Sequence, residues 1–432
     1  MILIRLNAHD SNLPRRRAMA SGAFLLTIQI VCLLIAISSV QAQTYKVLHR
    51  FTAKGDGEYP WAGVIRDSKG DIYGTTYWGG SFYMGAVFKI DARGKESTFH
   101  SFWGGDGMDP QASLIKDNSG NLYGTTSEGG SPKGGKCQNH GCGAVFKLGP
   151  SGKSTVQYAF TGGTDGDEPQ AALIRDRKGT LYGTTTYGGD SACENGCGLV
   201  FKVDKDGKET VLHSFTGGSD GAAPAEALIQ DQTGNLYGIT GSGGPSGWGT
   251  VFKLDTAGNE SILYGFSGGT DGGGPSGPLI RDKDGNLYGV TDFGGNLSYC
   301  RQGEYNGCGV VFKLDTTGKE TVLHAFTGGS DGAFPAGRLV RDDTGNLYGA
   351  TSFGGSLTAC YGGGCGTVFK VDPNGKETVL YAFPGGSDGM YPYGGVIMDK
   401  SGNFYGTTYW GGDSSCGGYG GYGCGVVFKL TP

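Results

Sequence analysis

The chain has 432 residues, a formal net charge of −5 and 87 glycines. Apolar residues make up 37% of it and alternate in short runs, which excludes a disordered polymer, and the glycines follow no Gly-X-Y period, which excludes collagen. No basic run lies outside the N-terminal segment, so we expect neither nucleic acid nor an anionic membrane surface as a partner.

Residues 1–42 have the features of a secretory signal peptide. Arg15–Arg17 are positively charged, Ala23–Ile37 form an apolar run, and Val40–Ala42 fit the small-residue rule for cleavage. The alternative is an uncleaved membrane anchor, for which the apolar run is short. We therefore expect an exported mature chain that begins at Gln43 and is secreted or periplasmic, with the cell surface as a further possibility. We expect no membrane contact beyond this segment.

The rest of the chain repeats one motif, Leu-Tyr-Gly or a near copy, at spacings of 50 to 60 residues. Repeats of this period are typical of solenoids, propellers and arrays. Seven tyrosines mark the copies: Tyr73, Tyr123, Tyr182, Tyr237, Tyr288, Tyr348 and Tyr405.

Each repeat contains four short runs rich in β-branched and aromatic residues, bounded by Gly, Asp and Pro, which predict four strands, A to D. In one repeat these runs are Arg338–Asp342, Asn346–Thr351, Thr367–Asp372 and Glu377–Phe383. Tight Asp-x-x-Gly turns join A to B, and similar tight turns join C to D. The connections from B to C and from D to A are longer and vary between repeats.

The count of strands at the two ends of the chain predicts a closed ring. A strand of type D, Tyr45–Phe51, precedes every other strand, and the last repeat has strands A, B and C but no D. Pairing the first strand with the last repeat removes the open edges that a linear array would keep. We therefore predict an all-β fold: a seven-bladed β-propeller of four-stranded blades, formed by residues 43–432 as a single domain and closed by pairing of 45–51 with 426–430.

At these residues the chain resembles the GloVer tandem-repeat family of exported bacterial proteins. The shared pattern is LIRDxxGNLYGTTxxGG followed by GxVFKLDxxGKETVLHSFTGGSDG, as in Leu279–Gly295 and Gly198–Gly221. The resemblance covers residues 45–430. It implies a repeat fold and export, and it implies no established activity.

In a propeller of this strand order, the B-to-C and D-to-A connections lie on one face, which we call the loop face, and the tight turns lie on the other, the turn face. Variable loops on a rigid scaffold are where binding sites are built, so we expect any function on the loop face.

Ten cysteines form five local pairs in the B-to-C loops. In an exported protein, even and closely spaced cysteines predict disulfides, which would stiffen these loops, and zinc is the alternative. The pairs are Cys137 with Cys142, Cys193 with Cys197, Cys300 with Cys308, Cys360 with Cys365, and Cys416 with Cys424.

Every D-to-A loop contains an aspartate in the pattern Asp-Gly-x-x-Pro. The carboxylates could bind calcium, but their presence in every blade favours a structural role in which each aspartate caps its own turn. We expect no metal and no cofactor. The residues are Asp56, Asp106, Asp165, Asp220, Asp271, Asp331 and Asp388.

Aromatic residues break the symmetry of the repeats where blades 7 and 1 meet, and we call this group the aromatic seam. Such rings suit stacking on a sugar or on an anchor residue of a protein, and the alternative is packing between blades. The group consists of Tyr59, Trp61, Tyr77, Trp78, Tyr391, Tyr393, Tyr409 and Trp410.

Three functions remain open. The first is a monomeric binding or scaffold module for a polysaccharide or cell-surface protein, and we favour it because the visible asymmetry is aromatic. The second is an extracellular polysaccharide-active enzyme, which predicts asymmetric polar residues with perturbed pKa values at the channel mouth. The third is a purely structural surface protein. No residue pattern marks a catalytic residue: the histidines at positions 49, 100, 213 and 324 share one place in strand D, which indicates a structural role.

Overall fold

The computed structural model describes residues 43–130, 137, 140–189, 192–300, 306–416 and 421–432. The predicted signal peptide lies outside this part of the chain. Thr44–Pro432 form one compact unit. Within the described residues, no helix is long and apolar enough to cross a membrane.

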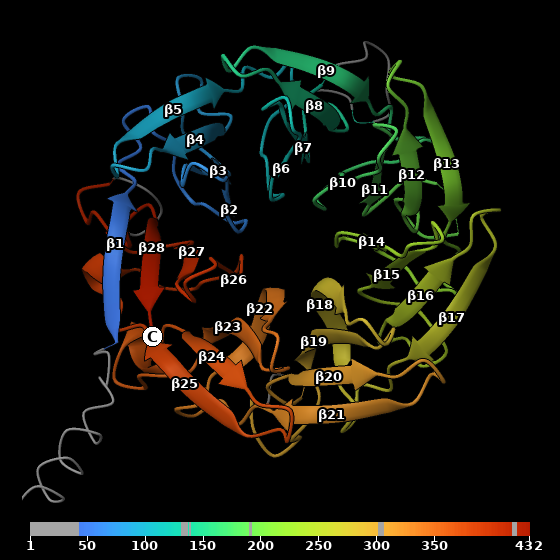
Figure 1. Cartoon of the computed structure of the whole chain (residues 1–432). Coiled ribbons are helices and arrows are strands. Elements are labelled where there is room, and N and C mark those ends of the chain that lie inside the picture. The colour runs from blue at the N-terminus through green and yellow to red at the C-terminus, as the bar shows by residue number, and fades with distance from the viewer. Residues whose placement is uncertain (1–42, 131–136, 138–139, 190–191, 301–305, 417–420) are drawn as a thin grey trace, which may run out of the picture. The chain divides into compact units, whose positions relative to one another are not determined.

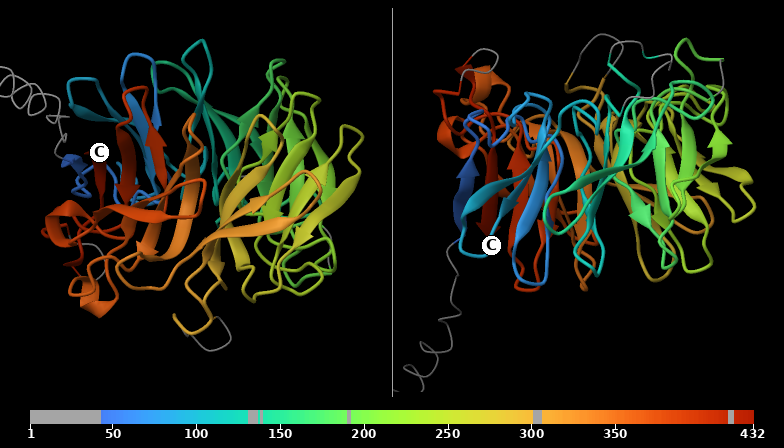
Figure 2. Two further views of the ribbon diagram at one scale, coloured as in Figure 1. Left: turned by 60° about the horizontal axis from the view of Figure 1, so that its bottom comes forward. Right: turned by 90° about the horizontal axis from the view of Figure 1, so that it is seen from above.

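Seven four-stranded antiparallel sheets form a closed ring, so the predicted seven-bladed propeller is confirmed (Figure 1). Strand A of each blade lies nearest the centre and strand D lies outside. Figure 2 shows the ring edge-on, with tight hairpin turns along one face and longer loops along the other.

The first four blades have the following strands. Blade 1 contains β2 (Ile65–Arg66), β3 (Ile72–Thr76), β4 (Ala86–Ile90) and β5 (Glu96–Ser101). Blade 2 contains β6 (Ile115–Lys116), β7 (Leu122–Thr126), β8 (Ala144–Leu148) and β9 (Ser154–Ala159). Blade 3 contains β10 (Ile174–Arg175), β11 (Leu181–Thr185), β12 (Leu199–Val203) and β13 (Glu209–Ser214). Blade 4 contains β14 (Ile229–Gln230), β15 (Leu236–Thr240), β16 (Thr250–Leu254) and β17 (Glu260–Gly265).

The last three blades complete the ring. Blade 5 contains β18 (Gly273–Arg281), β19 (Leu287–Phe293), β20 (Val310–Leu314) and β21 (Glu320–Ala325). Blade 6 contains β22 (Ala333–Arg341), β23 (Leu347–Phe353), β24 (Thr367–Val371) and β25 (Glu377–Ala382). Blade 7 contains β26 (Val396–Met398), β27 (Phe404–Thr408), β28 (Val426–Thr431) and β1 (Thr44–Arg50). Two 3-10 turns, η1 (Cys360–Gly362) and η2 (Gly386–Asp388), lie in loops.

The N-terminal strand closes the ring as predicted. β1 pairs antiparallel with β28, with Tyr45 opposite Leu430 and Val47 opposite Phe428. A β-bulge between Val47 and His49 shifts the register by one residue. The equivalent bulge occurs between the outer two strands of the other blades, as at Val200/Phe201 in blade 3, so the strand from the far end of the chain completes blade 7 with the geometry of a continuous blade.

The inner strands are less regular than the sequence indicates. Strand A is only two residues long in blades 1 to 4, whereas in blades 5 and 6 it extends to nine residues. The extended strands β18 and β22 each contain a bulge, at Ser276/Ile280 and at Ala336/Val340. A bulge changes the direction of side chains, and these two bulges lie beside the central channel.

Neighbouring blades are joined by a repeated pair of buried phenylalanines. The phenylalanine that follows strand D of one blade meets the strand C phenylalanine of the next edge-on, with ring centroids 5.0 to 5.3 Å apart. Edge-to-face contacts of this kind stabilise beyond their buried area. The seven pairs are Phe51 with Phe88, Phe102 with Phe146, Phe160 with Phe201, Phe215 with Phe252, Phe266 with Phe312, Phe326 with Phe369, and Phe383 with Phe428.

Candidate functional site

A cavity of about 970 Å³ lies among the inner strands of the ring. Its wall extends from Trp61, in the D-to-A loop of blade 1, to Lys116 and Asp117 at the turn-face end of β6. The residue before the proline of every D-to-A loop is left-handed, with φ between 51° and 61°. The residues that follow these prolines all line the cavity: Trp61, Gln111, Gln170, Ala225, Ser276, Ala336 and Tyr393.

The aromatic seam forms one network of ring contacts, and two of its members reach the cavity. Trp61 stacks on Tyr393 with centroids 4.8 Å apart and an interplanar angle of 13°. The edge of Tyr409 supports this pair, 5.2 Å from Trp61 and 5.7 Å from Tyr393. Trp61 remains 39% exposed. The pair therefore presents an apolar wall to the cavity at the junction of blades 7 and 1.

The other seam residues pack behind this pair or beside it. Tyr59 and Tyr391 are buried, and Tyr59 contacts Tyr409 at 5.1 Å between ring centroids. Trp78 and Trp410 are half-buried, and Tyr77 lies flat against Trp78 at 5.7 Å. Part of the predicted aromatic seam therefore packs at the ring closure, as the alternative expected, and part of it faces the cavity. Its role in ligand binding stays a prediction.

The aromatic contacts also continue from the seam to the rim of the loop face. Trp410 stacks on Tyr422 at 4.9 Å, and Tyr422 meets the edge of Tyr361 at 5.8 Å. Tyr361 is 85% exposed. We call Tyr361, Tyr422 and Trp410 the aromatic track. It runs from the exposed Tyr361 to Trp410, whose ring contacts Tyr391 and Tyr409 in the seam.

Two carboxylates on the wall formed by blades 4 and 5 were missed from the sequence. Glu226 lies two residues after the proline of its loop, at a position where the other blades have alanine or glycine. Asp292 lies near the end of β19, directly after Thr291. Ser276 Oγ donates a hydrogen bond to Asp292 Oδ1 at 2.7 Å and is also 3.1 Å from the carbonyl of Pro335. The signal in the sequence is a break in the repeat symmetry, because no other blade has a carboxylate at either of these two positions.

The surroundings of both carboxyls favour their neutral forms. Burial raises the pKa of Glu226 to about 7, with a hydrogen bond from the Gly277 N–H opposing the shift and the charge of Asp292 adding to it. Burial also raises the pKa of Asp292, to about 6, although the hydrogen bond from Ser276 opposes this shift. Near neutral pH Glu226 can therefore donate as well as accept a hydrogen bond, whereas Asp292 remains mainly an acceptor.

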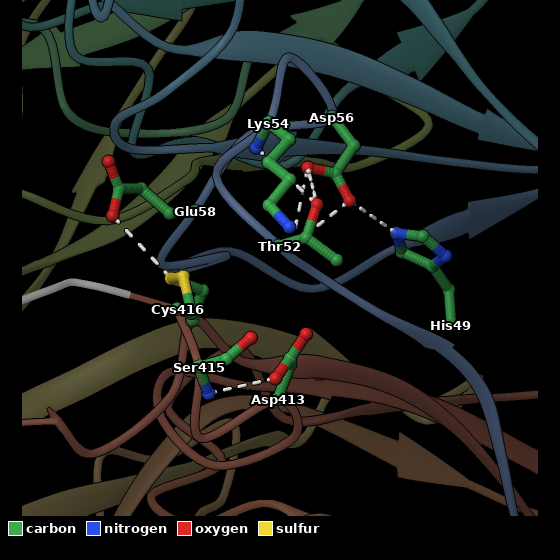
Figure 3. The surroundings of a disulfide bond; sticks show 9 residues. His49, Thr52, Lys54, Asp56, Glu58, Asp413, Ser415 and Cys416 are labelled. Carbon is green, nitrogen blue, oxygen red and sulfur yellow. Dashed lines mark hydrogen bonds and ion pairs between the residues drawn. A yellow bond between two sulfur atoms is a disulfide. The ribbon is translucent and has the colours of Figure 1, made fainter.

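The five predicted disulfides are confirmed. In blade 7, the Cys416–Cys424 bridge lies against the buried Glu58 of the first D-to-A loop, whose carboxylate is 3.6 Å from Cys424 Sγ (Figure 3). The zinc alternative is wrong, because the sulfurs are bonded to each other and offer no thiolates. Disulfides are typical of oxidising compartments, which supports the expectation of export.

The aspartates of the D-to-A loops cap turns, as predicted. Asp56 accepts a hydrogen bond from the Thr52 N–H at 3.1 Å and pairs with His49 at 3.1 Å (Figure 3). Asp106 pairs with His100 at 2.7 Å in the same way. The histidines of strand D thus have the structural role that their repetition indicates. Their partners are turn carboxylates.

Residues 35–194 and 191–420 match the protein family described as the Gloeobacter/Verrucomicrobia repeat. The chain belongs to this family. No curated protein matches the chain.

Solved structures agree on the fold. The extracellular domain of a hybrid two-component system from B. thetaiotaomicron is similar with a TM-score of 0.51 and 12% identity, over 90% of this chain. This chain spans only 42% of that structure. A gluconolactonase from Xanthomonas campestris aligns over 92% of both chains at 10% identity, with a TM-score of 0.41. At 12% identity, the likeness to the extracellular domain shows the propeller fold alone.

Proposed function

We propose that this family member is an exported carbohydrate-binding propeller whose central cavity receives part of a glycan. The observation that carries the proposal is the stacked pair of Trp61 and Tyr393 in the cavity wall. The apolar face of a sugar ring packs on such a surface, while its hydroxyls need hydrogen-bonding partners around the edge. Gln111, Gln170 and the Glu226/Asp292 wall supply such partners in the same cavity.

The aromatic track favours a polymer over a free monosaccharide. Tyr361, Tyr422 and Trp410 lie in ring contact from the exposed rim toward the seam. A glycan chain can stack on successive rings, and each ring has two rigid χ angles and therefore loses little conformational entropy on binding. A cavity of about 970 Å³ is large enough for a few sugar units, with the remaining units lying along the track.

The test is binding of the mature chain, residues 43–432, to a panel of plant and bacterial oligosaccharides by calorimetry. A Trp61→Ala variant should lose at least about tenfold in affinity, because a stacking ring at a binding site contributes roughly 1.4 kcal/mol or more. Trp103→Ala is the matched control, since Trp103 is also exposed but does not line the cavity. Circular dichroism would verify that both variants are folded.

Either of two results would contradict this proposal. One is the absence of binding to any glycan on the panel. The other is binding that Trp61→Ala and Trp103→Ala weaken equally, because the contact would then lie away from the cavity.

A second candidate, a polysaccharide-active enzyme, is favoured by the paired carboxyls Glu226 and Asp292. Two carboxyls with pKa values near neutrality can serve as general acid and general base. The test is release of new chain ends from any glycan that binds. A Glu226→Gln variant that binds normally but releases none would support the enzyme, and binding without release by the natural chain would exclude it for that glycan.

A further inference from the structure

Arg338 introduces a positive charge into the centre of the ring at a position where no other blade has a charged residue. It lies three residues after Pro335, where the other blades have Gly63, Ser113, Ala172, Ala227, Pro278 and Gly395. The bulge between Ala336 and Val340 in β22 contains it. Arg338 lines the cavity and its side chain is accessible to water, although the surrounding protein lowers the pKa of its guanidinium by desolvation.

Six charged residues line the cavity, and those toward the turn face are engaged in structural contacts. Lys116 donates to Asp67 at 2.6 Å and its ammonium lies 4.4 Å from the Tyr73 ring centroid. Asp117 accepts two N–H bonds of its own turn. Arg175 lies over the Tyr123 ring at 5.6 Å. The other three are Glu226, Asp292 and Arg338, from the adjacent blades 4, 5 and 6.

Arg338 has no ion pair within the described residues. An arginine that lines a cavity, is accessible to solvent and has no ion pair among the described residues is suited to an anionic group of a ligand, which its planar guanidinium can bind through two hydrogen bonds.

We infer that Arg338 binds an anionic group on the glycan, so that the ligand class of the central cavity is an acidic polysaccharide. This inference rests on the proposed glycan-binding function and specifies which class of glycan is bound. Trp61 and Tyr393 would contact the apolar face of a sugar unit, and Arg338 would bind a carboxylate or sulfate that projects from the chain. Because its pKa is raised to about 7, Glu226 can take up a proton near neutral pH, which reduces its repulsion of an entering anion.

The experiment compares charged and uncharged versions of one glycan. Oligogalacturonate, its methyl ester and a sulfated galactan oligosaccharide would be titrated by calorimetry into the mature natural chain, Arg338→Gln and Arg338→Lys. Arg341→Gln is the matched control, because Arg341 belongs to the same strand but stacks on Tyr288 on the turn face. Arg338→Lys keeps the charge without the fork and would still be informative if Arg338→Gln failed to fold.

We expect the natural chain to bind one acidic glycan at least about tenfold more tightly than the neutral ester. Arg338→Gln should remove that preference, Arg338→Lys should reduce it, and Arg341→Gln should keep it. Comparing the titration of oligogalacturonate with that of the sulfated galactan shows whether the cavity binds a carboxylate or a sulfate. Equal affinity for charged and neutral glycans, or a preference unaffected by Arg338→Gln, would overturn this inference. If a neutral glycan still binds in a Trp61-dependent way, the proposed function stands, and if nothing binds, both fail.

Discussion

Each residue of the repeated Leu-Tyr-Gly motif has a separate structural role. In blade 4, Leu236 is buried in the core, and the Tyr237 hydroxyl donates to the turn carboxylate of Asp231 at 3.1 Å. The guanidinium of Arg281, from blade 5, lies 5.7 Å from the Tyr237 ring centroid. The tyrosine therefore fixes the turn of its own blade and contacts the next one. The same arrangement recurs at Tyr123, Tyr288 and Tyr405.

The glycine of the motif makes room for the phenylalanine of strand C. A Cβ placed on Gly238 would lie 2.5 Å from Phe252 Cζ and 2.8 Å from Leu228 Cδ2. Both of these neighbours are fully buried, so neither can move away easily. The requirement at this position is space, since the backbone of Gly238 is not left-handed.

Gly238→Ala should therefore destabilise the ring by about 1–3 kcal/mol through overpacking. Gly149→Ala is the control, because its Cβ would meet only the Lys153 carbonyl oxygen, at 3.9 Å. Urea unfolding followed by tryptophan fluorescence measures both variants. Equal stability of the two variants would show that the Phe252 contact is not tight in solution.

At the scale of elements, the interfaces between blades are near copies of one another. Phe51 meets Phe88 at 5.1 Å with an interplanar angle of 65°, and Phe215 meets Phe252 at 5.1 Å with the same angle. Phe51 follows β1, the strand that comes from the other end of the chain. The ring closure thus has the packing of a continuous chain, although it joins the two termini.

Phe51→Ala and Phe215→Ala should consequently cost similar free energies of unfolding, each about 3–5 kcal/mol, because each removes one ring of an equivalent buried pair. Chemical denaturation of the two variants gives the comparison. A loss at Phe51 far smaller than at Phe215 would indicate that the closure between blades 7 and 1 opens in solution before the rest of the ring.

At the scale of the whole molecule, a repeated glutamate makes stability depend on pH. The first residue of strand D is a glutamate in most blades, and each has a carboxyl oxygen that is buried without a hydrogen-bond partner among the described residues. Burial, together with the charge of an aspartate in the preceding D-to-A loop, raises the pKa of four of them to about 7 from an ordinary value of 4.5: Glu209, Glu260, Glu320 and Glu377.

The aspartates of the A-to-B turns act in the opposite direction. Burial alone would raise the pKa of Asp342, but hydrogen bonds from Asn346 and Thr344 outweigh it and lower the pKa to about 2. A lowered carboxyl pKa gives stability that is present above about pH 4 and is lost as pH falls toward 2. A raised pKa gives stability that is present below about pH 4.5 and is lost as pH rises through 7.

We therefore expect maximal stability near pH 4 to 5 and a decline toward pH 8, by roughly 1 kcal/mol for each of the four glutamates after allowance for screening by water. Urea midpoints at pH 5 and pH 8 measure the effect. Replacing all four glutamates with glutamine should flatten the decline. Stability that increases between pH 5 and pH 8 would contradict this account.

The sequence by itself determined the number of blades, the closure by Tyr45–Phe51 and the cysteine pairing. These features depend on alternation, turn residues and short separations along the chain, which are local and repeat seven times. For strands B, C and D, the boundaries predicted from the sequence agree well with those of the structure. The inner strand A was the exception, because its length depends on how closely neighbouring blades approach one another at the centre.

The tertiary structure alone decided which side chains share the cavity. Trp61 and Tyr393 come from opposite ends of the chain, and Glu226, Asp292 and Arg338 come from three further blades. Their convergence depends on the left-handed turns before the prolines, on the bulges of β18 and β22, and on ring closure. The sequence locates each of these residues within its repeat, but only the closed ring directs them toward a common cavity, where burial raises the pKa values of Glu226 and Asp292.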